Sequence, residues 1–303
     1  MSPQAEIIHG LTQVAPSLSP KYFYDARGSA LFEQITVLPE YYPTRVERGI
    51  MAGHGPDIAR SVGTGSTVIE LGAGNCDKAR ALCELLAPKR FVAVDISEAF
   101  LHEAVASMRP SFPDIAIQAL VADLSADIVL PANLPLAQRL VFYPGSSIGN
   151  FDPRQALALL SRMRGLLGDD GALLIGVDLV KDASILHAAY NDAAGITAAF
   201  NLNALAHVNR LIGSDFDVAQ WQHVAFFNPV ASRIEMHLQA STDTLVRWPG
   251  GGRSFVRGER IHTENSYKYL AEDFLDLLRR AGLPNTQVWT DELAWFAVVL
   301  ARP

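Results

Sequence analysis

The sequence contains few cysteines and few charged residues, and its acidic side chains outnumber its basic ones. Cys76 and Cys83 are its two cysteines among 303 residues, so thiolates can build neither a disulfide framework nor a four-ligand zinc site. This cysteine usage fits a reducing compartment, and we expect a cytoplasmic protein. Lys and Arg number 25 against 32 Asp and Glu, which gives a net charge of −7. Because that sign disfavours a phosphate backbone, we expect no nucleic-acid partner.

Long hydrophobic runs are also missing. The longest apolar segments, such as Ala172–Val177 and Ala294–Ala301, are far shorter than the roughly 20 residues that a membrane-spanning helix needs. The first residues lack the basic region and apolar core of a secretory signal. Hydrophobic residues nevertheless make up 49% of the chain, and its length allows two compact units or one enlarged unit. We therefore expect a globular protein without membrane contact.

From residue 67 onward, short apolar segments alternate with longer stretches whose apolar residues recur every three or four positions. Strands that alternate with crossover helices predict a parallel sheet, so the fold class is α/β and doubly wound. The predicted strands are Thr67–Leu71, Arg90–Val94, Ile117–Val121, Arg139–Tyr143 and Ala172–Val177, and the predicted helices are Lys78–Leu86, Glu98–Met108 and Gln155–Leu167.

This alternation stops near residue 181. Residues 182–211 are predicted to be mostly helical, and Val224–Phe227 and Arg233–Leu238 follow as candidate antiparallel strands. The sheet is then expected to be completed by the helix Ala271–Ala281 and by the strands Gln287–Trp289 and Trp295–Leu300. An insertion within one sheet is the simplest account of this order.

Glycines and acidic residues mark the ends of the first three predicted strands. The segment Glu70–Asn75 carries Gly72 and Gly74, which permit a tight turn and let backbone amides approach a ligand closely. Asp95 ends the second strand, where an acidic side chain accepts hydrogen bonds from ribose hydroxyls. Asp123 ends the third strand and is placed to reach an adenine amino group. An adenosine-containing ligand is therefore predicted.

A dinucleotide is the alternative ligand for this turn. The third glycine of the dinucleotide fingerprint would fall at Asp77, where a carboxylate would repel a pyrophosphate. S-adenosylmethionine has no phosphate and carries a sulfonium cation, so the acidic residues Glu70 and Asp77 suit it better. The residues thus favour S-adenosylmethionine and methyl transfer.

Seven segments distributed along the chain carry a specific resemblance, namely Lys21–Asp25, Gly28–Ile35, Leu38–Arg45, Pro144–Asn150, Asp178–Asp182, Tyr190–Asn201 and Arg233–Met236. Through these segments the chain resembles the histidine-specific N-alpha-methyltransferase family of ergothioneine biosynthesis over almost its whole length. The resemblance implies a mostly parallel, seven-stranded Rossmann-like sheet with an inserted α+β domain that recognises the substrate. The expected methyltransferase domain is 44–180 with 268–303, and the expected substrate domain is 1–43 with 181–267.

The resemblance also assigns residues to the two ligands. An imidazole offers one donor and one acceptor when neutral, so a carboxylate and a hydroxyl suit its two nitrogens. The resemblance implies that the cofactor is bound by Tyr24, Gly72, Gly74, Lys78, Asp95, Asp123 and Leu124. It implies that the amino acid's ammonium and carboxylate are bound by Asn150 and Tyr190 near Gly145, the imidazole by Tyr41, Glu264 and Ser266, the apolar wall by Met236, and the methylated nitrogen by Phe32.

Ordinary structural roles compete with these assignments. Isolated tyrosines such as Tyr41 and Tyr190 are usually half-buried aromatics with hydroxyls facing water, and Glu264 by itself would be a solvated strand residue or a helix cap. The residues single out no dedicated base. The amine's proton is relayed by the Tyr41 hydroxyl or by a water held by Asn150, or it leaves directly to solvent.

Other chemistries find little support in the sequence. The eight histidines lack the close spacing of a local metal motif, so we expect no metal, and Cys76 has no evident basic partner and is interpreted as packing. The implied activity is transfer of three methyl groups to the α-nitrogen of free L-histidine by a monomer. Methylation of another free amino acid, arginine or tryptophan, and a non-catalytic nucleoside-binding module are the alternatives. Glu264 argues against tryptophan, because an indole pocket would not retain a carboxylate that is costly to desolvate.

Overall fold

The computed structural model describes residues 2–124 and 126–303, which form two compact units. We call Pro43–Val180 with Tyr267–Pro303 the sheet unit, and Met1–Tyr42 with Lys181–Ser266 the insert unit. Within the described residues, no helix combines the length and the apolar character that crossing a membrane requires.

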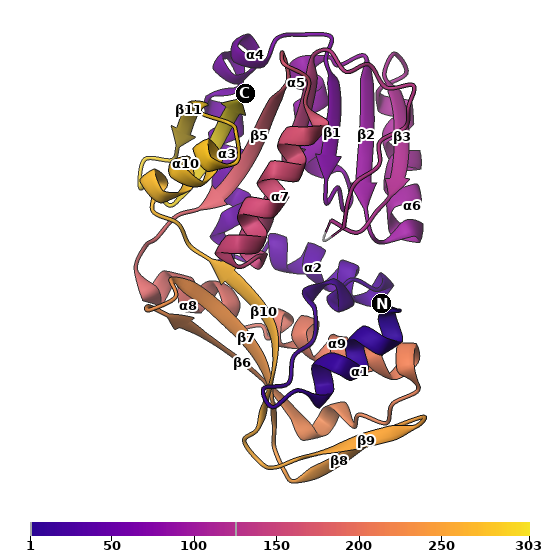
Figure 1. The fold of residues 1–303 in the computed structure, drawn as a ribbon. Helices are drawn as coiled ribbons and strands as arrows, with labels where there is room; N and C mark the ends of the chain where they lie inside the picture. The colour runs from indigo at the N-terminus through magenta and orange to yellow at the C-terminus, as the bar shows by residue number, and fades with distance from the viewer. Residues whose placement is uncertain (1, 125) are drawn as a thin grey trace. The chain divides into compact units, whose positions relative to one another are not determined.

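The sheet unit is built on seven strands in the order β11-β12-β5-β4-β1-β2-β3 (Figure 1). Neighbours among the five strands from β5 to β3 pair parallel, whereas β12 pairs antiparallel with both β5 and β11. This confirms the predicted mostly parallel, seven-stranded sheet. The strands are β1 (Thr67–Leu71), β2 (Arg90–Asp95), β3 (Ala116–Val121), β4 (Arg139–Tyr143), β5 (Ala172–Asp178), β11 (Asn285–Thr290) and β12 (Phe296–Arg302).

Helices cover both faces of this sheet, because successive strand residues point to opposite sides. Val68 packs in the cluster that includes α3 to α6, and Ile69 packs in the cluster that includes α7 and α10. Figure 1 shows α7 crossing the near face of the sheet. The helices are α3 (Tyr42–Gly53), α4 (Gly55–Val62), α5 (Asp77–Leu86), α6 (Glu98–Met108), α7 (Pro153–Leu166) and α10 (Ala271–Arg280), with the short 3-10 turns η2 (Arg109–Ser111) and η3 (Ser147–Asn150).

The insert unit packs helices against a separate three-stranded sheet in the order β10-β7-β6, and β8 and β9 form a hairpin. Its core joins apolar residues of α1, α9 and these strands, including Leu11, Leu205 and Leu238. The elements are α1 (Pro3–Thr12), η1 (Pro20–Phe23), α2 (Ala26–Thr36), α8 (Ala183–Tyr190), α9 (Ile196–Ile212), η4 (Val218–Gln220), β6 (Trp221–Asn228), β7 (Arg233–Ala240), β8 (Thr244–Trp248), β9 (Gly251–Phe255) and β10 (Arg260–Tyr267).

Candidate active site

The segment after β1 forms a tight turn against the end of β2. The N–H groups of Gly72 and Ala73 donate to the carbonyl of Val94 at 2.8 and 3.0 Å. Gly72 and Gly74 have φ angles of +70° and +53°, in the left-handed region that favours glycine. A Cβ atom built on Gly74 would meet nothing within 4 Å. The turn therefore leaves room for a ligand to approach its backbone.

Asp95 braces this turn from the end of β2. One carboxylate oxygen accepts from the N–H of Gly74 at 3.0 Å, and the other accepts from the N–H of Ser97 at 2.9 Å. Each carboxylate oxygen has a second lone pair, so the half-buried group retains capacity for hydroxyl donors. Asp95 thus shapes the glycine turn and can also accept from a ribose.

Asp123 and Leu124 follow β3 and complete a set of cofactor candidates from three neighbouring strands. The carbonyl of Leu124 accepts from the guanidinium of Arg162 at 2.9 Å. A Cβ atom on Gly72 would lie 4.0 Å from Cδ1 of Leu124, so the end of β3 lies against the glycine turn. The structure therefore brings Gly72, Gly74, Asp95 and Leu124 to one edge of the sheet.

The charges at this edge discriminate between cofactors. Burial raises the pKa of the Glu70 carboxyl well above its ordinary value, while the Lys78 cation opposes that rise. Asp77 is exposed in the first turn of α5, where a phosphate would otherwise bind. A carboxylate at that position disfavours a pyrophosphate and tolerates a sulfonium. The residues present fit S-adenosylmethionine better than a dinucleotide.

Lys78 leads to a residue that the sequence analysis missed. Its ammonium donates to one oxygen of Glu47 at 2.6 Å, and the other oxygen of Glu47 accepts from the N–H of Gly145 at 2.9 Å. Glu47 is 3% exposed. No local pattern marks this glutamate, because its partners lie 31 and 98 residues away along the chain.

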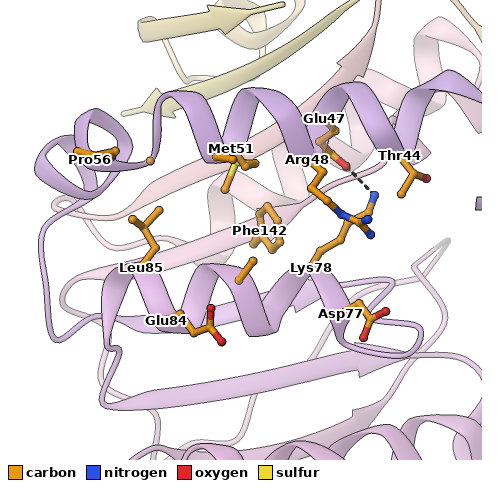
Figure 2. Close-up of a pocket in the computed structure, with 13 residues that line it drawn as sticks. Thr44, Glu47, Arg48, Met51, Pro56, Asp77, Lys78, Glu84, Leu85 and Phe142 are labelled. Atoms are coloured by element: carbon orange, nitrogen blue, oxygen red, sulfur yellow. Dashed lines mark hydrogen bonds and ion pairs between the residues drawn. The ribbon is translucent and has the colours of Figure 1, made fainter. Parts of the chain in front are cut away.

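A cavity of about 390 Å³ lies between α3, α4 and α5. Figure 2 shows Phe142, Met51 and Leu85 among its apolar lining and the Glu47–Lys78 ion pair at one end. Of the cofactor residues named from the sequence, Lys78 lines this cavity.

The loop 144–150 carries Gly145 and Asn150 at the end of β4. Gly145 has a φ angle of +79° and Ser146 one of +58°, so the chain turns sharply here. The hydroxyl of Ser146 accepts from the N–H of Asp178 at 2.8 Å. A Cβ atom on Gly149 would lie 2.9 Å from the carbonyl oxygen of Tyr267, so glycine is required for this close approach. The loop is thereby fixed, with half-buried Asn150 at its end.

Aromatic side chains of the insert unit form a continuous row of ring contacts. Tyr24 and Phe32 have ring centroids 5.9 Å apart, Phe32 and Tyr41 6.4 Å, and Tyr41 and Tyr190 6.4 Å. Phe200 of α9 adds contacts to Tyr24 and Phe32 at 5.7 and 5.9 Å. The structure thus brings together four of the predicted residues and adds Phe200 to them.

The predicted imidazole ligands lie on β10. Glu264 and Ser266 are 8% and 5% exposed, and the hydroxyl of Tyr190 donates to Oγ of Ser266 at 2.7 Å. The readings of Glu264 as a solvated residue or helix cap are wrong, because it is buried within a strand, and Tyr190 does not present its hydroxyl to water alone. Met236 is buried on neighbouring β7, and its carbonyl lies 3.0 Å from the hydroxyl of Thr263.

Buried polar groups orient these residues. Nε2 of His223 lies 2.9 Å from the carbonyl of Tyr190, and its Nδ1 lies 2.9 Å from the side-chain amide nitrogen of Asn201. A carbonyl accepts and an amide nitrogen donates, so the imidazole carries its proton on Nε2 and is neutral. Burial agrees with this assignment, because it lowers the pKa of His223. Oδ1 of Asn201 accepts from Thr263 at 2.8 Å, which ties α9 to β10.

The surroundings of Cys76 and of the potential metal ligands bear on two other chemistries. Cys76 is fully buried and burial raises the pKa of its thiol, which agrees with its interpretation as packing. Within residues 2–124 and 126–303, no group of three or more His, Cys, Asp or Glu side chains is arranged to hold a metal ion.

Comparisons with known proteins identify the family of this chain. The family model described as "Histidine-specific methyltransferase, SAM-dependent" matches residues 3–303. A histidine N-alpha-methyltransferase of Mycolicibacterium smegmatis is 41% identical, with 96% of this chain and 92% of the relative covered. One of Mycobacterium tuberculosis is 38% identical, with 98% and 93% covered. The ergothioneine biosynthesis protein 1 of Neurospora crassa is 34% identical over 88% of this chain, which spans 31% of that protein.

A match over nearly the whole chain, together with relatives at this level of identity, determines the family. The chain belongs to the S-adenosylmethionine-dependent, histidine-specific methyltransferases.

Proposed function

We propose that this enzyme transfers three methyl groups from S-adenosylmethionine to the α-nitrogen of free L-histidine. The products are histidine betaine (hercynine) and S-adenosylhomocysteine, and the reaction is the first step of ergothioneine biosynthesis. Bound S-adenosylmethionine supplies an electrophilic methyl group on a sulfonium. The side chains of this protein bind the amino acid, orient its α-nitrogen and handle its proton.

The observation that carries the proposal is the buried pair Glu264 and Ser266 on β10, with Tyr190 hydrogen-bonded to Ser266 at 2.7 Å. In a pocket that holds a ligand, a carboxylate accepts hydrogen bonds and a hydroxyl can donate one, so this pair suits a group that offers both an N–H and an acceptor atom. A neutral imidazole supplies one N–H donor for Glu264 and one acceptor nitrogen for a hydroxyl. Among histidine, arginine and tryptophan, histidine alone has a side chain with both a donor and an acceptor, since a guanidinium and an indole offer donors only.

The remaining residues place the reacting nitrogen. Asn150 and Tyr190 bind the ammonium and carboxylate groups near Gly145, and Phe32 and Tyr41 cover the nitrogen as methyl groups accumulate. The α-amine must lose a proton before it attacks, because its lone pair forms the new bond to the methyl carbon as the carbon–sulfur bond breaks and S-adenosylhomocysteine leaves as a thioether. The Tyr41 hydroxyl or a water held by Asn150 relays this proton, or it passes directly to solvent.

The test is incubation with methyl-labelled S-adenosylmethionine and a panel of free amino acids, followed by mass spectrometry. We expect histidine to be trimethylated on the α-nitrogen, and mono- and dimethylhistidine to be accepted as substrates. The imidazole and the carboxylate hold the substrate throughout, so loss of N–H donors should not release it. Product that stops at one methyl with excess donor, or that carries methyl on an imidazole nitrogen, would contradict the proposal.

The same panel separates the alternatives. Arginine could also donate to the carboxylate of Glu264. If methyl label appeared on arginine and not on histidine, arginine would be the substrate. Tryptophan offers an indole N–H and no acceptor nitrogen for a hydroxyl to satisfy, which makes it a poorer match. Binding of S-adenosylhomocysteine by calorimetry, with no label on any amino acid, would indicate a non-catalytic nucleoside-binding module.

A further inference from the structure

Glu47 is a buried carboxylate that belongs to none of the predicted ligand sets. It projects from α3 and is 3% exposed, and both its oxygens are hydrogen-bonded. Figure 2 shows it reaching toward Lys78 on α5. A charge in this position is expensive to desolvate unless it is paired, so its presence requires an explanation.

The fold reserves space for this carboxylate. A Cβ atom built on Gly176 of β5 would lie 2.2 Å from Oε1 of Glu47. Any larger residue at position 176 would therefore displace the carboxylate from its partners. Because Gly176 has no side chain, the carboxylate of Glu47 occupies the space beside β5 at that point.

The two partners of Glu47 come from different parts of the site. Lys78 lies in the first turn of α5, directly after the glycine turn that is expected to hold the cofactor. Gly145 is the second residue of the loop 144–150, which ends at Asn150, a residue expected to hold the amino acid. The ammonium of Lys78 would also lie 2.9 Å from a Cβ atom on Gly145, so all three groups are packed together.

We infer that Glu47 is a positioning residue that holds Lys78 for the cofactor and the loop 144–150 for the amino acid, and so aligns donor and acceptor. This inference rests on the proposed function for the identity of the two ligands. Methyl transfer is an in-line displacement whose rate depends on the alignment of the reacting atoms. A single carboxylate that holds both Lys78 and the loop 144–150 supports that alignment.

The two oxygens of Glu47 allow its two effects to be separated. In Glu47→Gln, the amide oxygen can still accept from the N–H of Gly145, but the amide NH₂ group would face the ammonium of Lys78 and repel it. In Glu47→Ala, both contacts are lost. The glutamine variant should therefore weaken cofactor binding alone, and the alanine variant should weaken binding of both the cofactor and the amino acid.

The experiment measures binding of S-adenosylhomocysteine, and then of histidine with S-adenosylhomocysteine saturating, by calorimetry. For Glu47→Gln we expect cofactor affinity to fall at least tenfold and histidine affinity to stay within threefold. For Glu47→Ala we expect both affinities to fall at least tenfold. Steady-state rates should show a raised KM for S-adenosylmethionine in the first variant, and a lowered kcat in addition in the second.

Glu84→Gln is the matched control, because Glu84 is an exposed glutamate of α5 that lines the same cavity. It should leave both affinities unchanged. A double-mutant cycle with Lys78→Met adds a second measurement, since paired residues give non-additive losses in cofactor affinity. Thermal unfolding of each variant separates misfolding from mispositioning, and if Glu47→Ala does not fold, Glu47→Gln and the cycle decide the question.

Cofactor affinity in Glu47→Gln within twofold of the wild type, or additive losses in the cycle, would overturn the inference. Equal losses for both ligands in Glu47→Gln would also overturn it, because they would indicate general disruption. Failure of the proposed function would give a different result, seen in the wild-type protein and not only in the variants. In that case the wild-type protein itself would not bind histidine or would not methylate it.

Discussion

Asp95 offers a quantitative test of how the end of β2 serves the cofactor. Its carboxylate accepts from the N–H groups of Gly74 and Ser97 at 3.0 and 2.9 Å, and the remaining lone pairs are available to ribose hydroxyls. Hydrogen bonds to a charged group contribute about 1.5–3 kcal/mol each, and the half-buried position favours the lower end. Losing two ribose bonds therefore costs roughly 3 kcal/mol, or about two orders of magnitude in affinity.

Asp95→Ala should accordingly weaken S-adenosylhomocysteine binding by about a hundredfold in calorimetry. It should also lower the free energy of unfolding, because the Gly74 and Ser97 amides lose their acceptor. Asp95→Asn should not rescue the protein fully, since its NH₂ group must face one of those two N–H donors. Glu98→Ala, an exposed acid in the next helix, is the control. Wild-type affinity in Asp95→Ala would refute the ribose assignment.

Further outcomes follow from the substrate residues, the buried histidines and the metal-independent chemistry. In competition assays, Glu264→Ala should weaken histidine binding far more than binding of an apolar amino acid of similar size, and equal losses would contradict its role. Asn150→Ala should weaken binding of all amino acids alike, and a defect confined to histidine would contradict that role. Burial lowers the pKa values of His237 and His262 from the ordinary 6.5, so the unfolded chain takes up protons first as pH falls below about 6.5. Stability in thermal unfolding should therefore decrease from pH 7 to pH 5, and His237→Phe should reduce that decrease. Activity should survive exhaustive chelation, because displacement at a sulfonium requires alignment and no Lewis acid; loss restored by a divalent metal would contradict this.

The central sheet was predictable because its signal is local. Buried parallel strands read as short apolar runs, and each of the five predicted in the first half of the sheet unit lies within one residue of the observed bounds. The helix Glu98–Met108 and the strands that complete the sheet were also predicted, although Phe296–Arg302 runs antiparallel to its neighbours.

The rest of the fold depends on contacts distant in sequence. Strand β10 is rich in polar residues, Arg260–Tyr267, so hydrophobic alternation does not reveal it, and yet it carries Glu264 and Ser266. The four helices before β1 were not predicted from periodicity either. Tyr190 and Glu264 could be given roles only through the family resemblance, because the burial that makes them distinctive is a property of the packed insert unit.

Buried charged side chains of the sheet unit lie beside the loop 144–150. Asp178 and Lys268 form an ion pair at 2.8 Å with side chains 1% and 0% exposed, and the N–H of Asp178 donates to Ser146. Glu47 pairs with Lys78 and accepts from Gly145. The loop 144–150 therefore contacts one residue of each ion pair, Asp178 and Glu47. Replacing a buried ion pair with apolar residues is often neutral or stabilising, so stability alone does not account for the buried Asp178–Lys268 pair or for the buried carboxylate of Glu47 beside this loop. Their value lies in geometry, because a displacement that requires sulfur, carbon and nitrogen in line loses rate steeply when either reactant is misplaced by about 1 Å.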